Sequence, residues 1–150
     1  MYFNTETNSI KMKEQKVTLE LLDGMAFKTE VDGHEIILDA EEQFGGSDRG
    51  PRPKPFVLVA LLGCTGMDVV SLLKKMRVEY DDFKVEAIST MTEEHPKYYD
   101  TIELVYSIWG KNVDKTKVEK SVALSTERYC GVHFMLSKSS ALTHRIVYHD

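Results

Sequence analysis

The sequence predicts an α+β protein in which antiparallel sheets wrap a long central helix, in the order βββ–α–ββ–αα–β. Segments 16–24 and 25–33 alternate apolar and polar residues and each end in Asp-Gly, which indicates strands joined by tight turns. No residue from Pro55 to Met67 is charged, which is typical of a buried helix. Two alternating segments, two helical segments and a final alternating segment follow this run.

The N-terminal part of the chain predicts a three-stranded meander. Leu19 and Leu21 lie on one side of the first strand, and residues 34–40 form the third strand. Residues 41–55 hold three of the four prolines and break the periodicity, so we expect a loop there. Because the strands before this loop need a cover for their apolar side, we expect residues 1–150 to form a single domain.

The rest of the chain predicts the elements that build the core. A helix runs from Phe56 to about Met76 and ends in a basic stretch, which suits a helix C-terminus. The remaining elements are strands at 79–90 and 98–110, helices at 112–129 and 130–140, and a last strand at 141–149. One face of the strand at 98–110 carries Ile102, Leu104, Tyr106 and Ile108. Asp114 is the expected N-cap of the next helix, whose apolar side carries Val118, Val122 and Tyr129.

The composition argues against two classes of partner. The chain has 150 residues, and its formal net charge is −5. Binding to nucleic acid or to an anionic membrane requires clustered Lys and Arg, so we expect neither partner. The first 16 residues lack the apolar core of a signal peptide, and the run from Pro55 to Met67 is shorter than the ~20 residues that span a bilayer. We therefore expect a cytoplasmic protein.

The sequence contains two cysteines, Cys64 and Cys130. Cys64 lies in the expected central helix between Gly63 and Gly66, with Asp68 one turn later on the same side. This pattern fits a small core residue as well as a reactive thiol, since free cysteines are often buried. Cys130 lies at the start of a short helix, where free N–H groups lower a thiol pKa. A reducing cytosol favours a transient, catalytic disulfide over a structural one.

The sequence around the two cysteines carries a family resemblance. The segments "PKPFVLVALLGCTGMDVVSLLKKM" and "STERYCGVHFMLSKS", in this order of elements, resemble the osmotically inducible protein C and organic hydroperoxide resistance (OsmC/Ohr) family. The resemblance implies an OsmC-like fold, an intertwined homodimer, and thiol-dependent reduction of organic hydroperoxides without a cofactor. It also implies that Cys64 is the peroxidatic cysteine and Cys130 the resolving one, with an external dithiol as reductant. Phe56, Ala60 and Met67 would then line an apolar pocket for the hydroperoxide.

The chain departs from the family pattern at the groups that hold the thiolate. Hydroperoxidases of the family carry a carboxylate nine or ten residues before the helix cysteine, where this chain has Pro55 and Lys54. The meander also lacks the family's arginine, so we expect Arg49 or Arg52, from the loop before the helix, to supply the cation. The departure favours a second hypothesis, a non-catalytic OsmC-like domain that binds a small apolar ligand or a partner. We expect no metal site that joins the cysteines with His133, because zinc sites usually show clustered pairs of ligands.

Overall fold

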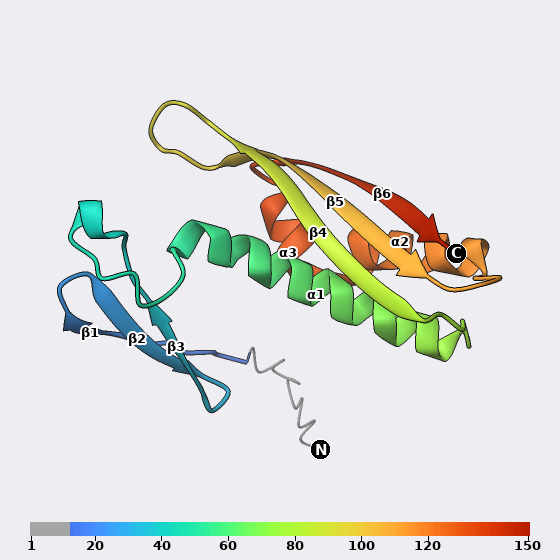
Figure 1. Ribbon diagram of the computed structural model, residues 1–150, viewed down its shortest axis with the longest axis horizontal. Coiled ribbons are helices and arrows are strands. Elements are labelled where there is room, and N and C mark those ends of the chain that lie inside the picture. Colours follow the sequence, from blue (N-terminus) through green and yellow to red (C-terminus); the bar gives the residue numbers. More distant parts are fainter. Residues whose placement is uncertain (1–12) are drawn as a thin grey trace, which may run out of the picture. The chain divides into compact units, whose positions relative to one another are not determined.

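The computed structural model describes residues 13–150 (Figure 1). The chain divides into two compact units, one that extends to Arg52 and one from Pro53 to Asp150. Within the described residues the order of strands and α-helices is the predicted βββ–α–ββ–αα–β, and the α+β class is confirmed.

The first unit is the predicted three-stranded meander. Its strands pair antiparallel in the order β1-β2-β3 and are β1 (Leu19–Asp23), β2 (Ala26–Val31) and β3 (His34–Leu38). The chain reverses tightly because Gly24 and Gly33 adopt φ angles of 54° and 79°, which glycine accepts at little cost. A short 3₁₀ turn, η1 (Glu42–Phe44), lies in the loop that follows.

Within the described part of the first unit, no residue covers the apolar side of β1. Val17, Leu19 and Leu21 are all exposed to solvent. Burying a side chain of this size contributes ~1.5–3 kcal/mol, so an exposed row of three leaves a substantial apolar surface without a partner. The meander therefore forms as expected, while its apolar side remains open.

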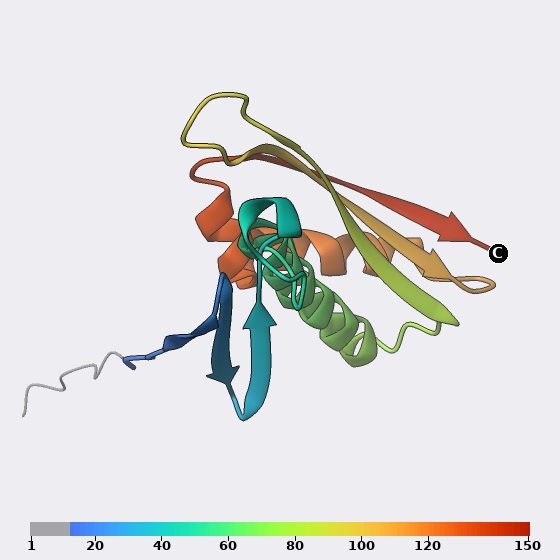
Figure 2. The same cartoon turned by 60° about the vertical axis from the view of Figure 1, so that its left-hand side comes forward.

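The second unit holds a three-stranded sheet with the helices on one of its faces (Figure 2). The strands are β4 (Asp82–Met91), β5 (Tyr99–Trp109) and β6 (Ala141–His149), in the order β4-β5-β6. The helices are α1 (Pro53–Lys75), α2 (Lys115–Leu124), a π-helical turn η2 (Ser125–Tyr129) and α3 (Gly131–Leu136). Helix α1 begins a few residues before the predicted start, because proline is tolerated in the first turn of a helix.

The last strand pairs differently from the prediction. Strands β4 and β5 are antiparallel as expected, but β5 and β6 run parallel, from the pair Thr101 and Ala141 to the pair Trp109 and His149. The helices between β5 and β6 carry the chain back to the end of the sheet at which β5 began. Such a crossover produces a parallel pair, so the expectation of purely antiparallel sheets was wrong for this strand.

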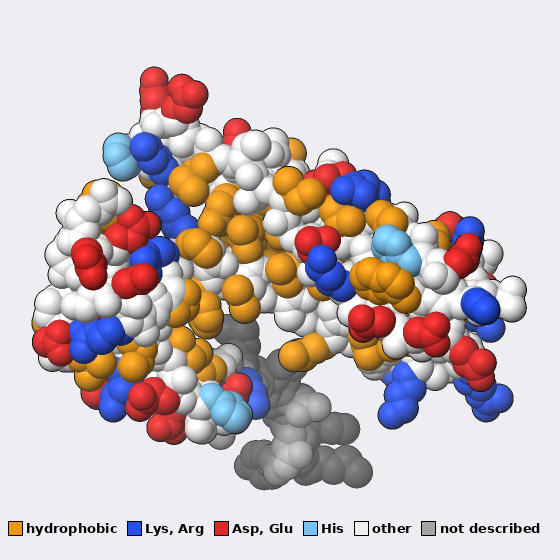
Figure 3. All heavy atoms as spheres, viewed as in Figure 1, with side chains coloured by type: hydrophobic (Ala, Val, Ile, Leu, Met, Phe, Trp, Pro, Cys, Tyr) orange, Lys and Arg blue, Asp and Glu red, His pale blue; other side chains and the backbone are white. Residues whose placement is uncertain are grey.

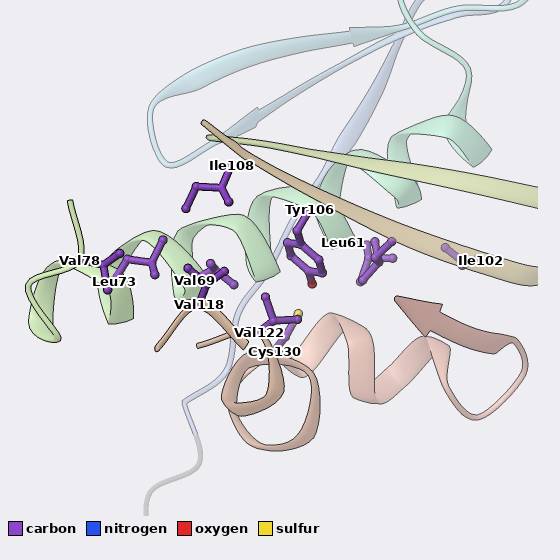
Figure 4. Packing of buried hydrophobic residues seen from close by; sticks show 11 residues of the cluster. Leu61, Val69, Leu73, Val78, Ile102, Tyr106, Ile108, Val118, Val122 and Cys130 are labelled. Carbon is purple, nitrogen blue, oxygen red and sulfur yellow. The ribbon is translucent and has the colours of Figure 1, made fainter. Parts of the chain in front are cut away.

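The core of the second unit lies between β5 and the helices, as predicted (Figure 4). The inward face of β5 is at most 1% exposed and consists of Ile102, Leu104, Tyr106 and Ile108. These side chains pack with Leu61, Val69 and Leu73 of α1 and with Val118 and Val122 of α2. The two-residue period of the strand and the 3.6-residue period of the helices place these residues on facing surfaces.

The segment after β5 confirms the expected N-cap and corrects one core residue. The Asp114 carboxylate accepts a hydrogen bond from the Lys117 amide at the start of α2. Tyr129 was expected on the apolar side of this helix, yet it is 50% exposed. The regular helix ends at Leu124, and the π-helical turn that follows changes the angular spacing of the side chains.

Helix α1 buries only one of its sides in the single chain. Its fully buried residues recur at every fourth position and are Leu61, Thr65, Val69 and Leu73. The remaining surface exposes further apolar residues, namely Val57, Val59, Met67 and Val70, and hydrophobic side chains gather along the middle of the face shown in Figure 3. By length and composition α1 could cross a membrane, a test that the core helix of a soluble protein also passes. A large apolar helix surface is therefore available to a partner.

Candidate active site

Cys64 and Cys130 lie side by side in the second unit, although they are far apart in the sequence. Both are free thiols. Their sulfur atoms and a carboxylate oxygen of Asp68 all lie within 4.8 Å of one another. Because a disulfide requires an S–S bond of about 2.05 Å, a small approach of the two side chains is enough to join the thiols.

Two local features place these three groups together. Cys64 and Asp68 are one turn apart on α1, so they share one side of the helix. Cys130 lies where η2 ends and α3 begins, and its Sγ accepts a hydrogen bond from the His133 amide at 3.3 Å. The sulfur thus caps the short helix α3 while it faces α1.

The two thiols differ in burial. Cys64 is half-buried, whereas Cys130 is only 3% exposed. Burial raises the pKa of Cys130 to about 12, and the neighbouring Cys64 thiol and Asp68 carboxylate add to this shift. The His133 amide favours the thiolate, as the sequence predicts, but one N–H group does not offset the loss of water. The predicted lowering of the Cys130 pKa was therefore wrong in direction.

A chain of buried hydroxyl groups ends at Asp68. The Ser125 hydroxyl donates to Oδ2 of Asp68 at 3.1 Å, and the Thr65 hydroxyl lies 2.8 Å from that of Ser125. The Tyr106 hydroxyl lies 2.6 Å from that of Thr65. All three hydroxyl-bearing residues are fully buried, and Figure 4 shows Tyr106 reaching from β5 toward the turn that carries Cys130.

The donor in each of these hydrogen bonds follows from proton counting. Each hydroxyl carries one proton, so Ser125, which donates to Asp68, accepts from Thr65. Thr65 in turn accepts from Tyr106. Burial raises the pKa of Tyr106 to about 12, which keeps this phenol protonated at neutral pH. The whole chain therefore points its protons toward the Asp68 carboxylate.

Sequence reasoning missed this hydroxyl chain. Its members come from three different elements, and hydroxyl residues are common in every segment, so no spacing singles them out. One signal was available, since Thr65 follows Cys64 directly and lies between it and Asp68 in a helix that is otherwise apolar. A polar residue at such a position needs a hydrogen-bond partner inside the core.

Two surface cavities border the cysteine pair. One of about 340 Å³ is lined by Asp68 and Tyr129, and one of about 280 Å³ is lined by Cys130, His133 and again Tyr129. Burial, and after it the electrostatic effect of the neighbouring His144, lowers the pKa of His133, so this imidazole is neutral at physiological pH. One cavity therefore reaches Asp68 and the other reaches Cys130, whereas Cys64 lines neither of them.

The residues predicted to bind substrate lie on another part of α1. Phe56 is half-buried, Ala60 is exposed, and Met67 is 76% exposed. Their spacing places them together on the side of the helix opposite its buried residues. Neither of the two cavities beside the cysteine pair includes them.

The two predicted cations belong to the first unit. Arg49 forms ion pairs with Asp23, at 2.6 Å, and with Asp39, at 3.4 Å. Arg52 forms ion pairs with Asp48, at 2.5 Å, and with Glu41, at 3.9 Å from its Nε, and this buried Nε has no hydrogen-bond partner among residues 13–150. Lys54 and Pro55 stand where hydroperoxidases of the family carry a carboxylate. Both lie in the first turn of α1, and this turn carries no acidic residue.

The cysteine pair also carries potential metal ligands. Among residues 13–150, Cys64, Asp68 and Cys130 are close enough to one another to hold a metal ion, and the His133 imidazole is not part of this group. Structural zinc sites use four ligands with thiolate or imidazole donors, whereas this set offers three. The site is better described by its thiols and carboxylate than as a metal centre.

The comparisons with known proteins match this fold and the segment that carries both cysteines. The sequence model of OsmC-like proteins matches residues 45–145. Protein YhfA of Escherichia coli is 36% identical over 124 residues, which are 82% of this chain and 90% of that protein. A hypothetical protein of Aquifex aeolicus has a TM-score of 0.79 at 33% identity, with 93% of this chain and all of that chain covered.

A more distant structure belongs to a named hydroperoxide resistance protein. The organic hydroperoxide resistance protein OhrB of Bacillus subtilis has a TM-score of 0.61, and the match covers 87% of this chain and 96% of that chain. The identity is 15%, so this likeness concerns the fold alone. Together, the matched segment, the similar relatives and the fold lead to one conclusion: the chain belongs to the family of OsmC-like proteins.

Proposed function

We propose that this protein is a thiol-dependent peroxidase that reduces organic hydroperoxides with Cys64 as the peroxidatic cysteine and Cys130 as the resolving cysteine. The observation that carries the proposal is the approach of the two sulfur atoms to within 4.8 Å, with one thiol half-buried and the other almost fully buried. Two free thiols in this arrangement can cycle between a dithiol and a disulfide.

The reaction consists of two displacements at oxygen and sulfur. The Cys64 thiolate attacks the terminal oxygen of the hydroperoxide, the O–O bond breaks, and the alkoxide leaves as an alcohol after it takes up a proton. Cys64 is then a sulfenic acid. Cys130 sulfur attacks the Cys64 sulfur, the S–O bond breaks, and water leaves as the disulfide forms. An external dithiol returns both cysteines to thiols.

Burial assigns the two roles. A hydroperoxide reaches the half-buried Cys64 more readily than Cys130, which is 3% exposed. Cys130 also has a pKa raised to about 12 by burial, so it remains a protonated, weakly nucleophilic thiol at neutral pH. Cys64 therefore reacts first, and Cys130 reacts only when a sulfenic acid lies beside it.

Consumption of an organic hydroperoxide tests the proposal directly. With cumene hydroperoxide and dithiothreitol, the wild type consumes peroxide catalytically, whereas Cys64→Ser lowers the rate at least ~1000-fold because the attacking atom is lost. A matched control is Lys74→Ala, a change at an exposed residue on the same helix that lines neither cavity. Equal rates for the wild type and Cys64→Ser would contradict the proposed function.

Arg52 is the better candidate for the cation that stabilises the Cys64 thiolate. Each of the two arginines faces two carboxylates, but Arg49 donates side-chain hydrogen bonds to both of its partners. Arg52 donates to Asp48, whereas its Nε lies 3.9 Å from Glu41 and has no hydrogen-bond partner among the described residues. Removing a cation that stabilises the Cys64 thiolate makes this cysteine a weaker nucleophile at neutral pH. We expect the double change of Arg49 and Arg52 to Ala to slow the reaction of Cys64 with iodoacetamide ~10-fold near pH 7, the factor that corresponds to ~1.4 kcal/mol of lost thiolate stabilisation.

The two single variants show how much each arginine contributes to the slower alkylation of Cys64. Arg52→Ala should account for most of the loss, and Arg49→Ala for little of it. Mass spectrometry in a Cys130→Ser background follows the alkylation of Cys64 across pH. If the alkylation of Cys64 shows the same pH profile in the double variant as in the wild type, neither arginine stabilises the thiolate. The cation would then come from a basic residue of a second subunit, such as Arg128.

A second candidate function is binding without catalysis. The absence of an acidic residue from the first turn of α1 favours it, because that position departs from the hydroperoxidases of the family. In this case the protein binds a small apolar ligand or a partner, and its cysteines are not used. Peroxide consumption that does not depend on Cys64 supports this candidate over the first.

We also propose that the protein works as a cytoplasmic homodimer in which both units form one functional domain. Support for the single domain comes from the match to OsmC-like proteins, which extends from residue 45 to residue 145 and so crosses the boundary at Arg52. Support for the dimer comes from the exposed apolar surfaces of β1 and α1. The reducing cytosol would supply the dithiol that resets the cysteine pair.

A further inference from the structure

The Asp68 carboxylate occupies a position that the two-cysteine scheme does not use. One of its oxygens lies within 4.8 Å of both sulfur atoms, and Oδ2 accepts a hydrogen bond from Ser125. Among residues 13–150, no basic side chain forms an ion pair with Asp68. Its one hydrogen-bond donor among these residues is the neutral Ser125 hydroxyl, so no cation competes with an approaching proton for the carboxylate.

The second chemical step needs such a group. A thiol with a pKa of about 12, as burial gives Cys130, is ionised in only ~1 molecule in 10⁵ at pH 7. The step also expels hydroxide from the Cys64 sulfenic acid, and hydroxide leaves readily only when it takes up a proton. One group that removes a proton from Cys130 and gives a proton to the leaving oxygen meets both needs.

We propose that Asp68 is the general base and then the general acid of the resolving step. The inference rests on the proposed function. Asp68 accepts the proton of the Cys130 thiol while the Cys130 sulfur forms a bond to the Cys64 sulfur. The S–O bond of the sulfenic acid breaks, the departing oxygen takes the proton from Asp68, and water leaves. Asp68 is again a carboxylate, and the two cysteines, oxidised by the hydroperoxide, are joined in a disulfide.

The hydroxyl chain holds Asp68 ready for this role. Tyr106 donates to Thr65, Thr65 to Ser125, and Ser125 to Asp68, so the buried chain ends in a donor that is fixed on one oxygen of the carboxylate. It also restricts the rotation of the Asp68 side chain, which keeps one oxygen near the sulfur atoms. Ser125 is accordingly a positioning residue, since it acts on the reaction through Asp68.

Asp68→Asn tests the proposal because it keeps the shape of the side chain and removes its ability to accept a proton. Sulfenic acid formation at Cys64 is measured with a dimedone trap in a Cys130→Ser background, and disulfide formation by rapid acid quench and mass spectrometry. We expect Asp68→Asn to form sulfenic acid at least as fast as the wild type, because a negative charge beside Cys64 is lost. We expect disulfide formation to slow ~100-fold or more.

The pH profile separates catalysis from a structural effect. In Asp68→Asn the disulfide step should speed up ~10-fold per pH unit, because hydroxide then has to ionise Cys130. The wild type should show a shallower profile near neutral pH, and Asp68→Glu should recover part of the lost rate. Asp81→Asn, a change at an exposed carboxylate of the same unit, should match the wild type in both steps.

Three results would overturn the inference. The first is disulfide formation in Asp68→Asn at the wild-type rate. The second is an equal slowing of both steps, with an unchanged pH profile, which would show that Asp68 only supports the structure of the site. The third is a wild type that forms no sulfenic acid with hydroperoxide, which refutes the proposed function itself and with it the role of Asp68.

Discussion

One equivalent of cumene hydroperoxide should convert the wild-type protein into a form with an intramolecular Cys64–Cys130 disulfide, which dithiothreitol reverses. The physical reason is the order of reactivity in the cysteine pair. The half-buried Cys64 meets the peroxide, and the buried Cys130 becomes a nucleophile only toward the sulfenic acid beside it. Peptide mapping by mass spectrometry without reduction identifies the bond.

The single cysteine variants should separate the two steps. Cys130→Ser should stop at the sulfenic acid of Cys64 and, with excess peroxide, progress to the sulfinic and sulfonic acids, because no thiol resolves it. Cys64→Ser should leave Cys130 unmodified at the same dose, since its pKa of about 12, raised by burial, keeps it protonated. Oxidation of Cys130 in the absence of Cys64 would contradict the assigned roles.

The protein should have twice the mass of its 17.1 kDa chain in light scattering at micromolar concentration. Among residues 13–150, two apolar surfaces are exposed, one on β1 and one on α1, where only 22% of the residues in the most apolar stretch are buried. Soluble proteins rarely leave contiguous apolar surfaces of this kind in water. A second copy of the chain is the partner that the family resemblance implies.

The two glycines of α1 contribute differently to this expectation. A Cβ atom at Gly63 would meet no atom within 4 Å, so this position leaves room for the backbone of a second copy. A Cβ atom at Gly66 would lie 3.5 Å from the Val85 side chain, so Gly66 faces β4 of its own chain. Of these two glycines, only Gly63 is therefore a candidate for close packing between subunits.

Met67→Glu should weaken the dimer by about two to four orders of magnitude. Met67 is 76% exposed in the single chain, and burying a side chain of this size contributes ~1.5–3 kcal/mol. A two-fold interface contains the residue twice, so the loss is doubled. Light scattering over a dilution series measures the dissociation, with Ile88→Glu, an equally drastic change at an exposed residue of β4, as the control. A stable monomer in the wild type would exclude the dimer.

The amino-acid sequence by itself determined the local elements of this protein. The alternation of apolar residues along β5 predicted its buried face, and the acidic residue Asp114 predicted the start of α2. These features depend on periods of two or 3.6 residues and on capping groups, which neighbours in the sequence decide. The contexts of Cys64 and Cys130 also sufficed to identify the family.

Only the tertiary structure decided the direction of β6 and the surroundings of the thiols. The parallel pairing of β5 and β6 depends on where the crossover helices return the chain, which no local pattern encodes. Ser125 meets Thr65 and Asp68 from another helical segment, so their hydrogen bonds exist only after packing. A helix start favours a low pKa at Cys130, yet burial removes water from the sulfur and reverses the shift. Solvation is a property of the folded core, and it sets the chemistry of this cysteine.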